Sequence, residues 1–280
     1  MGNIINETVF SDCVNKALGV NLKMAGLAYD ATAEVGEVSS WGNKVSFPRF
    51  NRTAKVATIV KGTAIVPADV DMADCTADIL QTGGSIRVFD KDAHSIKGAT
   101  LDRMAEQLAQ EAAKDIDSAL STTADKEATL LSALASANDV TEDEMLDAMQ
   151  LFNDQQDVDS YSGICINSRM RKSFVKMDAF TSTEKTYMTN GNGIVKNGCI
   201  GYFMGVPVVV SDNGTYDTAK AESKIYFLKK GALAYVLQQS PKIEEQREGL
   251  LLATDIIDSQ LYATKVLDTT GIVIARKTIA

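Results

Sequence analysis

Residues 85–121, SIRVFDKDAHSIKGATLDRMAEQLAQEAAKDIDSALS, contain the change of hydrophobic period that decides the fold. Up to about residue 93 the chain reads as short β segments, and from Ile96 apolar residues recur at helical spacing. The apolar stripe comprises Leu101, Met104, Leu108, Ala112, Ile116, Ala119 and Leu120, and the residues expected to face away are Asp102, Arg103, Glu106, Gln110, Glu111, Lys114 and Asp117. We therefore predict one amphipathic helix over 96–121, ~39 Å long at 1.5 Å per residue.

The fifty residues before this helix predict a long β ribbon. KVSFPRF (44–50) alternates Val45, Phe47 and Arg49 with other residues, and its proline suits an edge or the end of a strand. The return strand is SIRVFDKD (85–92), after Gly83-Gly84. Because an isolated hairpin is marginally stable in water, we expect this ribbon to lie on another structure.

The N-terminal forty residues predict an arm. Phe10, Val14, Leu18 and Leu22 have helical spacing and indicate a short helix. Beyond Leu27 the residues are small and polar, so we expect an extended segment rather than a compact unit.

The residues after the long helix predict a mixed α/β segment. Thr141 and Glu144 have the spacing of a capping box, with Val140 and Met145 as a hydrophobic staple, which predicts a helix to about Asp154. Further expected elements are a buried strand at 163–167, a basic helix with Arg169, Arg171, Lys172 and Lys176, a strand at 205–211, two strands around Gly231, strands near 242–247, 260–267 and 272–276, and a hairpin turn at 268–271.

Composition and charge exclude several classes of protein. The formal net charge is −9 and the pI is about 4.8, which excludes a general positive coat for nucleic acid. No apolar run approaches the roughly 20 residues of a membrane span, and MGNIINETVF lacks the regions of a signal peptide. Cys13, Cys75, Cys165 and Cys199 form no CxxC pair, and four free thiols fit a reducing cytoplasm.

The sequence contains no catalytic constellation. His94 is the only histidine, which excludes a site built on several imidazoles, and no nucleophile elbow or phosphate-binding loop occurs. The acidic groups are Glu142, Asp143, Glu144 and Asp147, then Glu244, Glu245 and Glu248, then Asp255 and Asp258, and we interpret them as solvated faces. We therefore predict no enzyme, no catalytic or metal residues and no cofactor.

The order of these parts resembles the major capsid proteins of tailed bacteriophages, which share the Hong Kong 97 fold. The segments that carry the resemblance are KVSFPRF (44–50), SIRVFDKDA (85–93), AAKDIDSAL (112–120), GICINSRMRKSF (163–174), NGCIGYFMGVPVVVSDN (197–213) and LYATKVLDTTGIVIA (261–275). The resemblance implies an α+β subunit with an N-terminal arm at 1–40, an extended β-hairpin loop at 41–93, a spine helix of the peripheral domain at 94–124, an axial domain at 125–238 and peripheral return strands at 239–280.

The function implied by this resemblance is structural. Such subunits self-assemble into pentamers and hexamers of an icosahedral or prolate phage head that encloses double-stranded DNA, in the virion capsid, after assembly as a procapsid in the cytoplasm of the host bacterium. A separate scaffolding protein is expected, or a segment removed before residue 1, together with a portal and non-specific contacts to the packaged DNA, and no membrane. The alternative is an encapsulin-like nanocompartment shell around a protein cargo, although residues 197–213 resemble the phage pattern more closely.

The resemblance also directs attention to contacts between subunits. Some relatives join a loop lysine to an asparagine of the peripheral domain, but no asparagine follows Asn213 here, so we expect non-covalent cohesion or a decoration protein. The candidate contact residues are Trp41, Phe47, Arg49, Phe50, Arg52, Lys55 and Lys61. Packing within the subunit is the alternative for the first four. The central hypothesis is that residues 41–93 reach out to complete another molecule.

Overall fold

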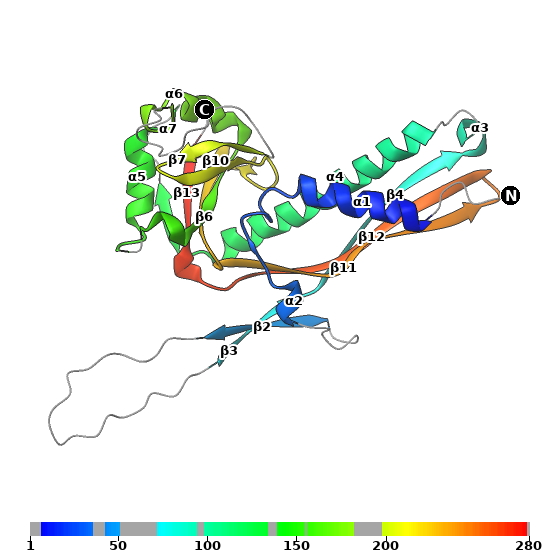
Figure 1. Cartoon of the computed structure of the whole chain (residues 1–280), viewed down its shortest axis with the longest axis horizontal. Helices are drawn as coiled ribbons and strands as arrows, with labels where there is room; N and C mark the ends of the chain where they lie inside the picture. The colour runs from blue at the N-terminus through cyan, green and yellow to red at the C-terminus, as the bar shows by residue number, and fades with distance from the viewer. Residues whose placement is uncertain are drawn as a thin grey trace, which may run out of the picture.

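The computed structural model describes residues 7–35, 43–50, 72–93, 98–133, 139–154, 156–181 and 198–278. These residues form two sheets with helices packed on them and a two-stranded ribbon (Figure 1). The helices are α1 (Glu7–Asn21), α2 (Thr32–Val35), α3 (Asp90–Ala93), α4 (Gly98–Glu127), α5 (Glu142–Gln150), α6 (Arg171–Lys176) and α7 (Asp178–Thr181).

The first sheet is four-stranded and extends away from the second. Its order is β1 (Tyr29–Asp30), β11 (Leu233–Glu248), β12 (Ala253–Val266) and β4 (Leu80–Phe89), with β11 and β12 forming one long antiparallel hairpin. Helix α4 runs along this sheet with α1 beside it (Figure 1). Alternate residues of β12 point to opposite faces, as strand geometry requires. Tyr262 packs in the cluster that contains Ile116 of α4, and Ala263 packs in a cluster with Phe47.

The second sheet is seven-stranded and holds the largest apolar cluster. Its order is β5 (Leu130–Ala133), β13 (Ile272–Thr278), β10 (Glu222–Lys229), β6 (Tyr161–Ile166), β8 (Val206–Val210) and β7 (Cys199–Phe203), with β9 (Tyr216–Asp217) paired to β10. Buried residues of β6, β7, β8, α5, α6 and α7 form that cluster. The predicted strands at 163–167 and 205–211, and those on either side of Gly231, are confirmed.

The long hairpin β11–β12 is inserted between two neighbouring strands of the second sheet. β10 and β13 pair antiparallel, from Glu222 opposite Thr278 to Leu228 opposite Ile272. The predicted boundary at residue 239 therefore falls inside β11, and the last strand returns to the second sheet.

The predicted hairpin turn at 268–271 is wrong. The side chain of Asp268 accepts hydrogen bonds from the backbone N–H and hydroxyl of Thr270 and caps a single 3₁₀ turn, which directs the chain from one sheet to the other.

The long helix differs from its prediction in length and in one face residue. It starts at Gly98 and continues six residues beyond the predicted end, because Ala124 is still buried in the apolar cluster between the helix and residues of both sheets. Leu108, Ala112, Ile116 and Leu120 of the predicted stripe are buried as expected. Asp117, predicted to face solvent, is fully buried.

Asp117 explains why the N-terminal region is not an extended arm. Its carboxylate accepts hydrogen bonds from the backbone N–H groups of Lys23, Met24 and Ala25, at 3.2, 3.1 and 3.0 Å. Burial raises the pKa of this carboxyl, against the lowering effect of those hydrogen bonds. The short helix is confirmed as α1, but residues 24–31 fold back on their own chain, and β1 pairs with β11.

The helix predicted from the capping box is confirmed as α5. The Thr141 hydroxyl accepts from the Glu144 backbone N–H at 3.4 Å, and the Glu144 carboxylate accepts from the Thr141 backbone N–H at 3.0 Å. The helix ends at Gln150, before the predicted Asp154. Val140 and Met145 are both buried in the cluster of the second sheet, as the staple predicts.

Candidate assembly surfaces

The tip of the β11–β12 hairpin presents three leucines to solvent. Leu250, Leu251 and Leu252 are 99, 51 and 63 % exposed. The tip lies at the end of the molecule farthest from the second sheet, next to α3 (Figure 1). A run of exposed large apolar side chains on a polar hairpin is typical of an interaction surface.

The backbone of this tip is held in an unusual conformation. Leu252 has φ of 49°, in the left-handed region that leucine rarely adopts. Its carbonyl accepts a hydrogen bond from the backbone N–H of Asp90 at 2.9 Å, and the Leu251 N–H donates to the Glu248 carbonyl at 3.2 Å. The leucines are therefore presented by a fixed turn.

Two bidentate ion pairs below the tip join the hairpin to β4 and to α3. The Arg247 guanidinium donates to both carboxylate oxygens of Asp90, at 2.5 and 2.6 Å, and Arg87 donates to both oxygens of Asp255, at 2.6 and 2.7 Å. The hydrogen bond from Arg87 lowers the pKa of the Asp255 carboxyl. Bidentate pairs fix geometry as well as charge, so they set the direction of the tip.

The leucine tip is not among the surfaces predicted from the sequence. The strand prediction stopped at residue 247 and resumed at 260, so the segment between them was not assigned to an element. The signal was present as three consecutive leucines after the polar run EEQREG (244–249). A turn between two strands is expected to be polar, so this departure indicates a contact surface.

The predicted contact residues fall in and around the two-stranded ribbon of β2 (Lys44–Phe50) and β3 (Met72–Asp78). Phe47 is 1 % exposed and packs on Ala234, Val236 and Ala263 of its own chain. For Phe47, packing within the subunit is therefore what the structure shows, because no side-chain surface remains for a neighbour. Arg49 and Phe50 lie in β2 opposite Ala73 and Met72. Trp41, Arg52, Lys55, Lys61 and also His94 lie outside the described residues.

The return leg of the predicted ribbon belongs to the first sheet. All ten residues of β4, Leu80 to Phe89, pair with β12 of the same chain. The hypothesis that residues 41–93 reach outward is therefore wrong for 80–89. The physical reason is that Ile86 and Val88 contribute to the apolar cluster under α1 and α4. Pairing with β12 of its own chain therefore lets this strand bury apolar side chains within the subunit.

The charged and reactive groups give no sign of catalysis in the described part of the chain. There, no group of three or more His, Cys, Asp or Glu residues is placed to hold a metal ion. No described helix has the length and apolarity needed to cross a membrane.

The four cysteines form no disulfide bonds, and burial raises the pKa of the Cys165 thiol to about 12, which makes this thiol unreactive. Of the acidic groups read as solvated, Glu244 is exposed, but Asp258 is buried.

Comparison with known proteins gives a likeness of fold. No family profile and no curated protein matches the sequence. A solved structure from Mycobacterium phage Che8 superposes with a TM-score of 0.64 and 19 % identity over 89 % of each chain. The capsid structure of cyanophage P-SCSP1u gives 0.62 and 13 %, covering 86 % of this chain and 85 % of that one. A virus-like particle from Pyrococcus furiosus gives 0.58 and 13 %, covering 96 % and 98 %.

These likenesses define the class of fold. The chain is a mixed α+β protein with the fold of phage capsid shell proteins, as the sequence resemblance predicted. The similarity extends over nearly the whole of each chain, so it concerns the complete arrangement of both sheets and not one shared motif.

Proposed function

We propose that this chain is the major capsid protein of a tailed bacteriophage, a structural subunit that assembles into pentamers and hexamers of a closed head around double-stranded DNA. The observation that carries the proposal is the likeness of fold to capsid proteins over at least 85 % of both chains. The leucine tip supports it, because a free subunit leaves those side chains in water whereas a shell can cover them.

The proposed roles of the parts follow the Hong Kong 97 arrangement with adjusted bounds. Helix α4 is the spine, and with the first sheet it forms the peripheral domain. The second sheet with α5, α6 and α7 forms the axial domain, which gathers around the five-fold and six-fold positions. Residues 41–78 serve as the extended loop, and α1 with the segment after it takes the place of the arm.

The proposed partners are other copies of this chain, a separate scaffolding protein, a portal and, for added cohesion, a decoration protein. The packaged DNA is contacted without sequence preference. The acidic net charge of −9 is compatible with this role, because the capsid encloses the DNA and does not need to bind its phosphate backbone at every point. The proposed location is the virion capsid, with assembly in the cytoplasm of the host. Catalysis, cofactors and a membrane have no part in this function.

An encapsulin-like shell around a protein cargo is the second candidate. The observation that favours it is the likeness to a virus-like particle over 96 % of this chain. The two functions differ in content, since a phage head holds a genome behind a portal vertex and a nanocompartment holds an enzyme.

The test is purification of the expressed protein followed by sedimentation and negative-stain imaging. The proposal predicts shells, tubes or sheets built from five-fold and six-fold rings, and particles isolated from a phage lysate should contain DNA. A monodisperse monomer at high concentration, with or without a scaffolding protein, would contradict both candidates. Particles filled with protein and lacking a portal would favour the second.

A further inference from the structure

The row of β12 residues that faces α4 is interrupted by two polar side chains. Ile256 and Tyr262 of this row are packed in apolar clusters with α4, as a core-facing strand requires. Between them stand Asp258 and Gln260, which are 4 and 2 % exposed. A carboxylate and an amide in the middle of a buried row depart from the pattern that packs a sheet on a helix, and such departures concentrate at functional positions.

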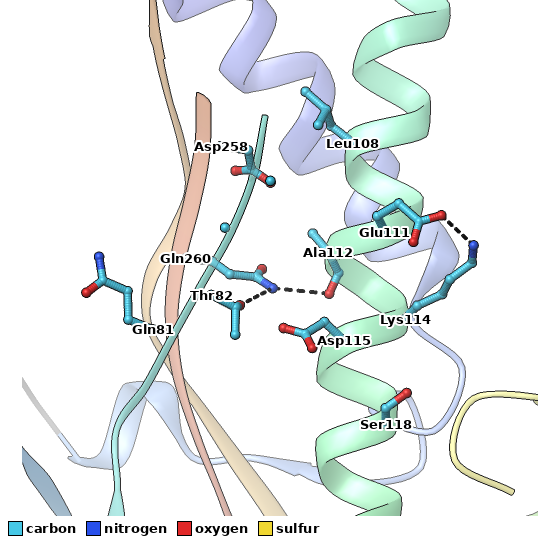
Figure 2. Close-up of a pocket in the computed structure, with 12 residues that line it drawn as sticks. Gln81, Thr82, Leu108, Glu111, Ala112, Lys114, Asp115, Ser118, Asp258 and Gln260 are labelled. Atoms are coloured by element: carbon cyan, nitrogen blue, oxygen red, sulfur yellow. Dashed lines mark hydrogen bonds and ion pairs between the residues drawn. The ribbon is translucent and has the colours of Figure 1, made fainter. Parts of the chain in front are cut away.

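The neighbouring strand leaves a hollow next to these two side chains. Gly84 lies opposite Asp258 and Gly83 opposite Ser259 in the β4–β12 register. A Cβ at Gly84 would meet only the Leu108 side chain, at 3.9 Å, so glycine leaves space between the sheet and the helix. The resulting cavity is about 650 Å³ and is bounded by Thr82 and Leu108 as well as Asp258 and Gln260 (Figure 2).

Two hydrogen-bond acceptors at the cavity have no partner within the described part of the chain. Asp258 Oδ1 and Gln260 Oε1 are buried and have no partner among the described residues. The Gln260 amide nitrogen already donates to the Thr82 hydroxyl and the Ala112 carbonyl, each at 3.2 Å (Figure 2).

The charged groups of α4 at the cavity are already engaged. Asp115 accepts from the Tyr262 hydroxyl at 3.1 Å. Lys114, the one cation among the described residues that line the cavity, is ion-paired with Glu111 at 2.6 Å. A buried carboxylate without a counter-charge is costly, so the site calls for an incoming cation with several donors.

We propose that this cavity receives a lysine or arginine side chain from a second copy of the chain, which pairs with Asp258 and donates to Gln260. The inference rests on the proposed function, since it needs neighbouring copies. An ammonium or guanidinium group brings three to five donors, enough to serve both of the unpartnered oxygens. A metal ion is a poorer match, because the described residues provide no cluster of three His, Cys, Asp or Glu side chains for one.

The charge distribution of the chain indicates where that cation originates. Between Lys44 and Ala68 the sequence has five basic residues and no acidic residue, in a chain with a net charge of −9. The base of that ribbon packs through Phe47 on the sheet face that carries Ala263, which is opposite to the face covered by α4. A ribbon from another copy is therefore the better source of the cation than the ribbon of the same chain.

The test compares assembly of wild type, Asp258→Asn and the control Glu244→Gln, which changes an exposed carboxylate on the neighbouring strand. Asp258→Asn should raise the subunit concentration for half-maximal assembly by about tenfold or more, because it removes one partner of a buried pair. The same variant should leave the subunit folded by circular dichroism, and Glu244→Gln should assemble like wild type. Equal assembly of Asp258→Asn and wild type would overturn the inference and would mean that the cavity holds water alone.

A second measurement uses the wild-type protein and needs no variant. Particles assembled from a mixture of ¹⁴N and ¹⁵N subunits are treated with a carbodiimide, which joins a carboxylate directly to a lysine in contact with it. The inference predicts mixed-isotope peptides that join Asp258 to a lysine, or protection of Asp258 from modification on assembly when the partner is an arginine. Links within one chain, or equal modification of Asp258 before and after assembly, would overturn it. Failure of wild type to form any particle would instead refute the proposed function.

Discussion

At the scale of single residues, Asp117 joins the N-terminal segment to α4. Replacing it with alanine leaves the buried backbone N–H groups of Met24 and Ala25, and the partly buried one of Lys23, without this acceptor, and a buried group without an acceptor costs about 1–3 kcal/mol. We expect Asp117→Ala to lower the free energy of unfolding of the subunit by about 3 kcal/mol or more in urea titrations. Glu111→Ala, on the exposed side of the same helix, serves as the control. A loss below about 0.5 kcal/mol, the size of an ordinary surface change, would contradict this role.

Asp258 makes the stability of the free subunit depend on pH. Burial raises the pKa of its carboxyl to about 6, whereas the unfolded chain has the ordinary value near 3.9. Between these values the folded state binds more protons, so the free energy of unfolding falls as pH rises, by up to about 3 kcal/mol, and stays low above pH 6. The difference between Asp258→Asn and wild type should therefore grow in favour of the variant from pH 4.5 to 7. A difference that is constant over this range would contradict the prediction.

Other charges around Asp258 are unchanged in that comparison. The charged groups on the surrounding elements include Glu111, Lys114 and Asp115 on α4, Lys242, Glu244 and Glu245 on β11, Arg87 on β4, Asp255 on β12, and Asp12 and Lys16 on α1. They are present in both proteins, so the difference between the two unfolding curves isolates Asp258. This comparison applies to unassembled subunits, since an incoming cation would reverse the preference for the neutral carboxyl.

A substitution at Arg49 tests the prediction that the ribbon contacts neighbouring subunits. We expect Arg49→Glu to reduce particle yield more than it reduces the stability of the free subunit, because it reverses a charge in the basic stretch of the ribbon. Particle yield by sedimentation and thermal unfolding of the free subunit are the two readings. An unchanged yield would count against the role.

The sequence predicted apolar residues better than buried polar ones. Leu108, Ile116 and Met145 follow helical periodicity and are buried as expected. Asp117 and Asp258 were placed on solvated faces, because a charged residue is normally exposed and period analysis assigns it there. Their burial depends on residues that are remote in sequence. Asp117 is held by the backbone N–H groups of residues 23–25, and Asp258 lies opposite Gly84 of the neighbouring strand.

At the scale of elements, the tip of the β11–β12 hairpin is the surface most directly tied to assembly. Leu250→Ser combined with Leu251→Ser should strongly reduce particle formation, since burying one leucine contributes about 1.5–3 kcal/mol and each shell contains many such contacts. The free subunit should lose no more than about 1.5 kcal/mol of stability, because Leu250 is 99 % exposed and only about half of Leu251 is covered within the subunit.

A matched control for the tip is Val175→Ser. Val175 is an apolar residue that is 41 % exposed and lies on α6, one of the helices that pack on the second sheet. The account expects normal assembly from this variant. Equal loss of particles from both variants would show that general surface polarity is responsible, and normal assembly of the leucine variant would remove the tip from the proposed contacts.

Elements with a local signal could be predicted, and those fixed by long-range pairing could not. The residues of the α5 capping box, and the successive residues of the α4 stripe, lie only three or four positions apart, so both patterns can be recognised locally. The insertion of β11–β12 between β10 and β13 depends on pairing of Glu222 with Thr278, which no local pattern encodes. The sequence at 268–271 is compatible with both a hairpin turn and the observed 3₁₀ turn. Only the long-range pairing of the strands on either side decides between these two geometries.

At the scale of the whole molecule, cohesion between subunits should be non-covalent. The lysine-to-asparagine bond of some similar capsids lacks its acceptor, because the last asparagine of this sequence is Asn213. Assembled particles that are boiled and reduced should therefore run on a denaturing gel as one band near 30.1 kDa. A ladder of larger species would contradict this expectation.

The central claim is that neighbouring copies cover the surfaces that one subunit leaves open. The most direct measurement is a cryo-electron microscopy reconstruction of assembled particles at side-chain detail. The account predicts that the leucines at 250–252 and the ribbon of β2 and β3 each touch another copy of the chain. A shell in which both face solvent, or a protein that stays monomeric, would contradict it.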